Sequence, residues 1–449
     1  MTLTLIADDR CFQSAPGQYS YRDLLTRAEY AAQQLSASPL HRWAIYSNDI
    51  VEFIVFMLAA LKTDKELIVL PNNRPAFVEE IAGNAEGFLG QFDLSADTPW
   101  LQLADIPANS NTSINTLELP LTQKLTFFTS GSTGKPQRID KQFRQLINET
   151  RVLNETWGDQ AVGCKVIATV SHQHIYGMLF KLLWPLTFQR PVNGNTIQFT
   201  EELVAACHNE SDCLLISSPA HLDRFITDPD LELCRQRFRF IFSSGAPLST
   251  ATSLAVREQL QCPVTEVYGS TETGGIGWRQ QLPGQQVPWR LFSAVQSQLA
   301  ESGCLMVKSA YLVDDNWFET SDLAVFTADR EFVLQGRVDR IVKIEGKRLS
   351  LDELTAVIKK HSYVADAHAI VLQRKRANVS MVVALNHDGL AQLKQLGKFK
   401  FGQLLRSFLS DYFEQVVLPR RWRFVETLPR NSQGKLVRQD MEKLFESDS

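Results

Sequence analysis

A short run around residue 130 concentrates groups that bind phosphate. Two glycines, four hydroxyl groups and one ammonium group lie within seven positions, which are Thr129, Ser130, Gly131, Ser132, Thr133, Gly134 and Lys135. Glycines let backbone N–H groups approach an anion closely, and hydroxyl and ammonium groups add donors. The run is not a Walker A loop, because Thr129 stands where that motif needs glycine and Pro136 where it needs serine or threonine. It therefore predicts another kind of phosphate-binding loop, with a flexible polar loop as the alternative.

This loop and six later segments resemble the adenylate-forming superfamily, which contains acyl-CoA synthetases, adenylation domains of non-ribosomal peptide synthetases, and luciferases. The six segments follow in the family's order: SHQHIYG (171–177), SSGAPL (243–248), EVYGSTET (266–273), TSDL (320–323), GRVDRIVKIEGKRL (336–349) and LPRNSQGKLVR (428–438). Residues 19–35 are also similar to the family's opening helix, so the resemblance covers nearly the whole chain. Each motif alone is weak, but seven in order are very specific. The resemblance implies an AMP-forming acid–thiol ligase that uses ATP and Mg²⁺.

The reaction that the resemblance implies joins a carboxylate to the α-phosphorus of ATP while pyrophosphate leaves. Repulsion between negative charges and the cost of alignment make up most of the barrier, so the enzyme must supply cations and hydrogen-bond donors. By resemblance, the loop from Thr129 to Lys135 holds the β- and γ-phosphates, and Thr271 contacts the α-phosphate. Glu272 would hold Mg²⁺, a cation that needs hard oxygen ligands.

The same resemblance assigns residues to the nucleoside. Tyr268 would offer a flat face to adenine, and Gly245 and Ala246 would leave room for the base and the acyl chain. Asp322 would accept hydrogen bonds from the ribose hydroxyls, and Arg337 would donate to the ribose. Each of these residues alone has a plain structural alternative, such as a core aromatic or a turn cap, and only their ordered combination favours the site.

The C-terminal segments resemble the parts of the family that change between the two half-reactions. Lys435 would bridge the acid oxygen and the α-phosphate during adenylation. Asp339 matches the hinge position about which the small domain is thought to rotate, and Gly346 would line the channel for the thiol. His174 would lie at the acyl pocket, with a satisfied core histidine as the alternative. One departure is Ser321, which replaces the glycine of the family's T-G-D motif.

The identity of the acid is addressed by the residues after the loop. Amino-acid-activating relatives place an aspartate near the H-x-x-G segment, but residues 160–200 contain no acidic side chain. An unpaired substrate ammonium there would be costly to bury, so an α-amino acid is disfavoured. The apolar and aromatic stretch from Ile175 to Pro185 favours a fatty or aryl acid. By resemblance the thiol acceptor is an acyl carrier protein, and the alternative acceptor is CoA, as in a free-standing acyl-CoA synthetase. Two other functions stay open: an oxygenase that oxidises the adenylate, and a scaffold without activity.

These residues require an α/β framework to position them. Short apolar runs, which are typical of buried strands, alternate with amphipathic stretches, which are typical of helices. This alternation predicts an α/β fold, with a large N-terminal domain of mostly parallel sheets and helices. The predicted strands are 43–46, 67–70, 124–128, 165–169, 213–216 and 238–242, and the predicted helices are 28–35 and 52–61. A small α+β domain should follow, with helices at 351–360 and 401–413 and strands at 367–373 and 380–385.

Charge supports the same division. Residues 339–449 contain 20 Lys and Arg against 13 Asp and Glu, a balance of +7, and the rest of the chain contains 26 against 37, a balance of −11. We therefore predict an N-terminal domain over 1–338 and a small, mobile C-terminal domain over 339–449. The basic domain is suited to a polyanion, although drift in composition explains it equally well. Nucleic acid is not expected, because no basic stripe carries interleaved aromatic residues.

The chain shows no sign of export or of a membrane span. Its N-terminus lacks a basic region followed by an apolar core, and the most apolar stretch, from Val51 to Leu61, is too short to cross a bilayer. Seven scattered cysteines without a CxxC pair favour free thiols in a reducing compartment. We therefore expect a cytoplasmic protein, and the sequence leaves its oligomeric state open.

Overall fold

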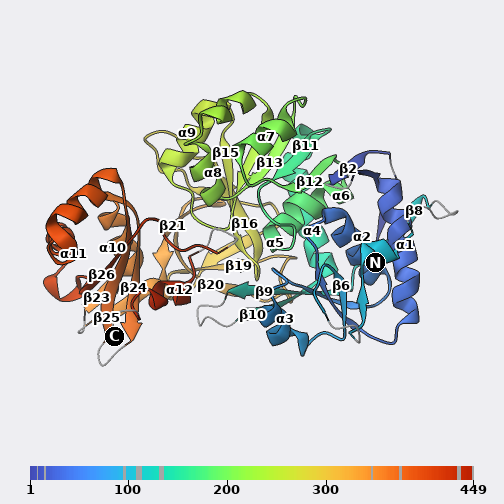
Figure 1. The fold of residues 1–449 in the computed structure, drawn as a ribbon, viewed down its shortest axis with the longest axis horizontal. Helices are drawn as coiled ribbons and strands as arrows, with labels where there is room; N and C mark the ends of the chain where they lie inside the picture. Colours follow the sequence, from blue (N-terminus) through green and yellow to red (C-terminus); the bar gives the residue numbers. More distant parts are fainter. Residues whose placement is uncertain are drawn as a thin grey trace. The chain divides into compact units, whose positions relative to one another are not determined.

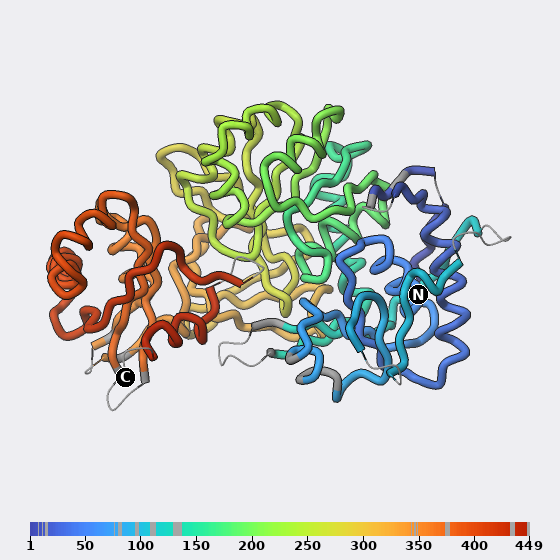
Figure 2. Tube along the Cα trace, in the orientation of Figure 1, coloured from blue at the N-terminus to red at the C-terminus, as the bar shows by residue number. Residues whose placement is uncertain are grey.

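The computed structural model describes residues 1–7, 9–14, 17–94, 98–107, 114–130, 136–344, 347–373, 377–431 and 436–446. The chain divides into two compact units, of which the first comprises residues 1–129, 136–296 and 308–318 and the second takes the remainder. The predicted boundary between Val338 and Asp339 falls within the second unit and stays a proposal about where the chain pivots. Figures 1 and 2 colour both units along the sequence.

The first unit contains a small, largely parallel sheet. Its strand order is β10-β9-β5-β4-β6-β7. The strands are β4 (Arg42–Tyr46), β5 (Glu66–Val69), β6 (Gly87–Gly90), β7 (Trp100–Leu101), β9 (Lys124–Ser130) and β10 (Pro136–Gln142). Helices α1 (Tyr21–Ala37), α2 (Ile50–Lys62) and α3 (Pro75–Ala82) belong to this region, and β1 (Thr2–Ile6) pairs with β8 (Thr116–Pro120). Helix α2 confirms the predicted helix at residues 52–61, and every residue from Ile50 to Leu61 is buried.

A second, larger sheet carries the middle of the chain. Within the first unit its order is β17-β16-β15-β14-β13-β11-β12-β2-β3, and β11 to β15 are parallel. Its strands are β2 (Cys11–Ser14), β3 (Gly17–Ser20), β11 (Lys165–Ala168), β12 (Val192–Thr196), β13 (Cys213–Ser217), β14 (Phe238–Ser243), β15 (Val264–Ser270), β16 (Gly274–Arg279) and β17 (Trp289–Leu291). The green to yellow part of the trace in Figure 2 follows β11 to β17.

Helices cover both faces of the parallel strands, which explains why β13 is buried at every position. One face packs against α7 (Thr200–Cys207), α8 (Pro219–Phe225) and α9 (Thr250–Leu260), which contribute Leu203, Leu222 and Val256. The other face carries an aromatic cluster in which Phe242 contacts Trp157 and Phe180 at ring-centroid distances of 4.8 and 5.1 Å. These two residues come from α4 (Phe143–Trp157) and from a π-helical turn (Met178–Leu183) between α5 (Ile175–Gly177) and α6 (Trp184–Thr187).

The second unit confirms the predicted α+β region. Strands β24 (Val364–Gln373), β25 (Ala377–Leu385) and β26 (Arg421–Val425) form a sheet that packs on one face against α10 (Leu351–Ile358) and α11 (His387–Ser410). The opposite face packs against Met441 of α12 (Arg438–Lys443) and against Phe445, which follows that helix (Figure 1). The unit also contains β18 (Gln296–Leu299), β19 (Cys304–Lys308), β20 (Phe318–Ala328), β21 (Glu331–Arg337), β22 (Ile341–Ile344) and β23 (Lys347–Ser350).

Two further sequence expectations have a structural outcome. Six cysteines with described side chains are free and buried: Cys164, Cys207, Cys213, Cys234, Cys262 and Cys304. Within the described ranges, no helix combines the length and the apolar character that a membrane span requires.

Candidate active site

A tight turn follows β15 and presents Thr271 and Glu272 at its tip. The N–H of Ser270 donates to Thr273 Oγ1 at 3.1 Å, and the N–H of Thr273 donates to Ser270 Oγ at 3.2 Å. These reciprocal bonds close the turn, while Thr271 and Glu272 between them stay half-buried. A hydroxyl and a carboxylate therefore stand together at the carboxyl end of a parallel strand, where ligands of such sheets usually bind.

Two buried charged side chains lie under this turn. The Nζ of Lys141, in β10, donates to the backbone oxygen of Glu272 at 2.6 Å and to that of Tyr311 at 2.9 Å. Glu149, in α4, accepts the N–H of Gly275 at 2.6 Å. Burial lowers the pKa of Lys141 to about 8 and raises the pKa of Glu149 to about 7, although the opposite charges of the two side chains partly offset the effect of burial in each.

The turn after β14 leaves open space at the predicted base and acyl position. Gly245 has φ +90°, a conformation that favours glycine, and an added Cβ would meet no atom within 4 Å. Ser244 Oγ donates to the backbone oxygen of Val267 at 2.8 Å, which ties this turn to β15. Ala246 lies at the tip of the same turn, so Gly245 and Ala246 are placed beside the strand that carries Tyr268.

Tyr268 lies at the end of β15 with its ring partly exposed. The centroid of its ring is 5.4 Å from that of Trp289, at an interplanar angle of 48°. The guanidinium carbon of Arg279 lies over the ring of Trp289, 4.4 Å from its centroid. Arg279 Nε also donates to Oε1 of the buried Glu266 at 2.9 Å. This chain of contacts fixes Trp289 behind Tyr268 and holds the tyrosine at the strand end.

Asp322, Arg337 and Asp339 come together in the second unit. Asp322 of β20 lies directly opposite Arg337 of β21 in the antiparallel ladder, and Arg337 Nη1 is 3.4 Å from Asp322 Oδ1. Arg337 also pairs with Asp339 through two bonds, Nε to Oδ1 at 2.9 Å and Nη2 to Oδ2 at 2.7 Å. A sequence separation of 15 residues thus becomes a direct contact between the two predicted ribose-binding side chains. Ser321 is accommodated within β20 without breaking the strand.

His174 and the apolar stretch after it have different environments. His174 is half-buried at the start of α5, whereas its neighbour His172 is buried against the backbone oxygen of Ser47, at 3.0 Å. From Met178 to Leu186 every side chain is buried, and Phe180 belongs to the aromatic cluster beneath β14. These side chains pack in the core, and the preference for a fatty or aryl acid that the stretch suggested stays a prediction.

Several predicted residues lie outside the described part of the chain. Gly131, Ser132, Thr133, Gly134, Lys135, Gly346 and Lys435 are not described, and Thr129 and Ser130 are described only as backbone at the end of β9. Their roles stay predictions.

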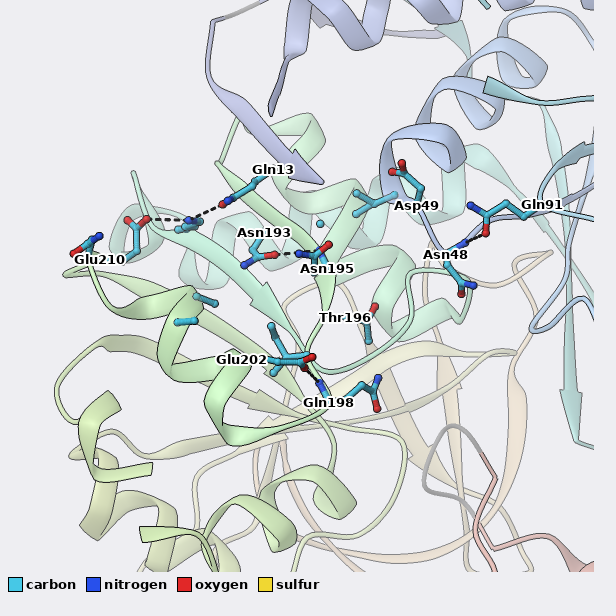
Figure 3. Close-up of a pocket in the computed structure, with 17 residues that line it drawn as sticks. Gln13, Asn48, Asp49, Gln91, Asn193, Asn195, Thr196, Gln198, Glu202 and Glu210 are labelled. Atoms are coloured by element: carbon cyan, nitrogen blue, oxygen red, sulfur yellow. Dashed lines mark hydrogen bonds and ion pairs between the residues drawn. The ribbon is translucent and has the colours of Figure 1, made fainter. Parts of the chain in front are cut away.

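A separate polar groove of about 1060 Å³ opens beside the N-terminus of α2 (Figure 3). Side-chain amides dominate its lining: Gln13, Asn48, Gln91, Asn193, Asn195, Gln198 and Asn209. Thr196 also lines it and accepts a hydrogen bond at 2.9 Å from Nζ of Lys181, whose pKa burial lowers to about 7. No predicted site residue with a described position lines this groove.

Comparisons with known proteins agree with the resemblance in the motifs. Residues 123–307 match the model of the family described as AMP-binding enzyme. Over this segment the chain is similar to AMP-binding enzymes. The match spans the glycine-rich loop and the Thr271–Glu272 turn, and the predicted reaction class, AMP-forming acid–thiol ligation, is confirmed at that level.

Individual relatives are distant. The chain is 25% identical over 315 residues to a 4-coumarate–CoA ligase of Cereibacter sphaeroides, which covers 70% of each chain. It is 24% identical over 379 residues to the fatty acid–[acyl-carrier-protein] ligase ScoC of Streptomyces coeruleorubidus, covering 74% of this chain and 69% of that one. The crystal structure of ATP-bound MatB from Rhodopseudomonas palustris matches with a TM-score of 0.80 at 18% identity, over 97% of this chain and 96% of the other. This likeness confirms the predicted α/β fold class.

The donor groups at the turn fit a magnesium ion held together with phosphates. Glu272 supplies a partly exposed carboxylate and Thr271 a hydroxyl, and both are hard oxygen donors. Mg²⁺ commonly uses one or two carboxylates and completes its shell with phosphate oxygens and water. Glu272 would therefore be able to hold the ion together with the phosphates of ATP.

Sequence reasoning missed Lys141 and Glu149. One signal was present, because Glu149 lies on the same helical face as Leu146 and Leu153, where an apolar residue is expected. A carboxylate on an apolar face indicates a buried partner. The partner, Lys141, gives no such signal, since it precedes the helix and its contacts are with backbone oxygens distant in sequence.

Proposed function

We propose that this chain activates a hydrophobic carboxylic acid with ATP as its acyl-AMP and transfers the acyl group to a phosphopantetheine thiol. The observation that carries the proposal is the Thr271–Glu272 turn at the end of β15, inside the segment that matches the AMP-binding enzyme model. Relatives named as CoA ligases and as an acyl-carrier-protein ligase support the chemistry.

In the first half-reaction a carboxylate oxygen attacks the α-phosphorus, and the bond from that phosphorus to pyrophosphate breaks. Thr271 would donate toward the α-phosphate, Glu272 would hold Mg²⁺, and Tyr268 would offer its ring face to adenine. Bound Mg²⁺ supplies positive charge that offsets the repulsion among phosphate oxygens. In the second half-reaction the thiol sulfur attacks the acyl carbon, AMP leaves, and the thiol proton is released to water.

Exchange of labelled pyrophosphate into ATP, across a panel of carboxylic acids, tests this proposal. Aryl and medium-chain fatty acids should stimulate exchange, whereas α-amino acids should not. The sequence around His174 supports this expectation: between residues 160 and 200 the basic side chains are Lys165, Lys181, Arg190, His172 and His174, and there is no Asp or Glu. Stimulation by amino acids alone would contradict the choice of substrate class.

The acceptor is proposed to be a carrier protein, with CoA as the alternative. The two acceptors differ in the area of this chain that they would contact. CoA would need only a few cations near the mouth of the thiol channel, whereas a carrier protein would contact a broader basic surface through its acidic side chains. The candidate cations are Lys343, Lys347, Arg348, Arg374, Lys375 and Arg376. Of these, Lys347 already pairs with Glu414 at 3.1 Å on an exposed surface.

We expect Gly346→Leu to leave adenylation intact and to block thiol transfer. A leucine side chain should fill the narrow passage that glycine leaves for a pantetheine arm. Acid-dependent pyrophosphate exchange measures the first step, and thioester formation from preformed acyl-AMP measures the second. Gly346→Ala provides the matched control, with a smaller loss. Normal thioester yield from the leucine variant would show that the thiol enters elsewhere.

We expect Lys375→Glu/Arg376→Glu to slow loading of a carrier protein more than transfer to CoA. Exposed charge attraction is screened over about 8–10 Å at physiological salt, so added salt should produce the same selective slowing. The control is Arg144→Glu/Arg151→Glu, which changes net charge equally at exposed positions of α4. Rapid turnover with CoA and none with a cognate holo-carrier protein would favour the acyl-CoA synthetase alternative.

A further inference from the structure

Lys141 occupies an unusual position for a lysine. Only 3% of its surface is exposed, and its ammonium group lies between the backbone oxygens of Glu272 and Tyr311. A buried charge is expensive unless several partners satisfy it, and here the partners are the carbonyl of the proposed magnesium ligand and a carbonyl 39 residues further along the chain. The ammonium therefore joins two segments that do not otherwise share a secondary-structure element.

Glu149 supports the same turn from its other end. Its carboxylate accepts the Gly275 N–H and is 95% buried. Gly274, with φ +67°, packs so closely against it that an added Cβ would lie 2.6 Å from Glu149 Oε2. Gly274 and Gly275, which follow Glu272, thus contact the carboxylate of Glu149. The backbone oxygen of Glu272 itself accepts a hydrogen bond from the ammonium group of Lys141.

We propose that Lys141, together with Glu149, is a positioning residue that orients Glu272 toward the metal. This inference rests on the proposed function of Glu272. A direct bond to the main-chain oxygen of Glu272 restricts rotation of that peptide unit, and so restricts the direction in which the carboxylate points. Partners of this kind behind a metal ligand typically change metal affinity or activity by about 10–100-fold when they are removed.

The chain offers a matched control for this role. Gln145 Nε2 donates to the same Tyr311 oxygen at 2.7 Å, but no hydrogen bond in the described structure links Gln145 to the backbone oxygen of Glu272. Gln145→Leu therefore disturbs the Tyr311 side of the cluster while leaving the contact to Glu272 in place. A purely structural cluster should respond alike to both changes, whereas positioning of the metal ligand should respond only to loss of Lys141.

The test variant is Lys141→Met/Glu149→Gln. Methionine has a similar length without the ammonium, and glutamine retains an acceptor for Gly275 while avoiding an unpaired buried carboxylate. We expect the double variant to raise the free Mg²⁺ needed for half-maximal pyrophosphate exchange about tenfold or more. Its KM for the carboxylic acid should change less than about threefold, because the acid does not contact the metal ligand's main chain.

Lys141→Arg should restore most of the Mg²⁺ response if it folds, since arginine can donate to both carbonyls. Circular dichroism and the thermal midpoint identify variants that have not folded. Wild-type Mg²⁺ dependence in a folded double variant, or an equal shift in Gln145→Leu, would overturn the proposal. Mg²⁺-ATP-induced thermal shift provides a readout that does not require turnover. If wild-type protein binds Mg²⁺-ATP but shows no acid-dependent exchange, the proposed function fails while the positioning role can still be measured.

Discussion

Replacing Lys435 with alanine should reduce acyl-AMP formation by about 100-fold to 1000-fold, or about 2.7–4 kcal/mol of transition-state stabilisation. The resemblance assigns this lysine to the acid oxygen and the α-phosphate, where negative charge accumulates as pyrophosphate leaves. The same variant should form thioester from preformed acyl-AMP at close to the wild-type rate, because the resemblance assigns Lys435 to the first half-reaction alone.

The two half-reactions must be measured separately for this comparison. Pyrophosphate exchange reports the first, and chemically prepared acyl-AMP supplied with the thiol reports the second. Lys443→Ala is the matched control, since Lys443 lies in α12 of the same region and pairs with Asp440 on the surface at 3.1 Å. An equal loss in both half-reactions would refute the assignment of Lys435 to adenylation alone.

Replacing Glu272 with glutamine should lower exchange by about 100-fold at limiting Mg²⁺ and much less at saturating Mg²⁺. Glutamine keeps the shape of the side chain and an acceptor oxygen but removes the negative charge that attracts the cation. Folding should change little, because Glu272 is only half-buried and the turn is closed by Ser270 and Thr273.

A magnesium titration of the exchange rate decides this prediction. Glu258→Gln, at an exposed position of α9, removes the same charge away from the turn and should leave the titration unchanged. An unaltered titration in Glu272→Gln would mean that another group holds the metal.

The sequence predicted the core strands well because continuous apolar runs leave few alternatives. Lys124–Phe128, Cys213–Ile216 and Phe238–Phe242 all lie within observed strands, with ends shifted by two residues at most. The predicted helix from Phe401 to Phe413 was only partly correct. The observed helix α11 starts at His387 and is interrupted by the non-helical backbone of Gly397, with φ 74°, and its part before that residue was not predicted.

The candidate site was predicted through motif order, and its supporting contacts were not. Asp322 and Arg337 could be paired because both belong to recognisable segments, and the antiparallel ladder places them opposite each other. Lys141 could not be paired with Glu272, since a side-chain bond to a backbone oxygen leaves no pattern in residue types. Similarly, Phe180 is apolar whether it lines a pocket or fills a core, and only packing distinguishes the two.

The central claim is that a carboxylate oxygen becomes bonded to the α-phosphorus of ATP. The most direct measurement supplies an accepted acid labelled with oxygen-18 in its carboxylate, together with ATP and the thiol acceptor, and analyses the products by mass spectrometry. The account predicts that AMP carries one oxygen-18 atom, because the bond that the thiol breaks lies between the acyl carbon and that oxygen, and that pyrophosphate carries none. Unlabelled AMP, or label in inorganic phosphate accompanied by ADP, would contradict it.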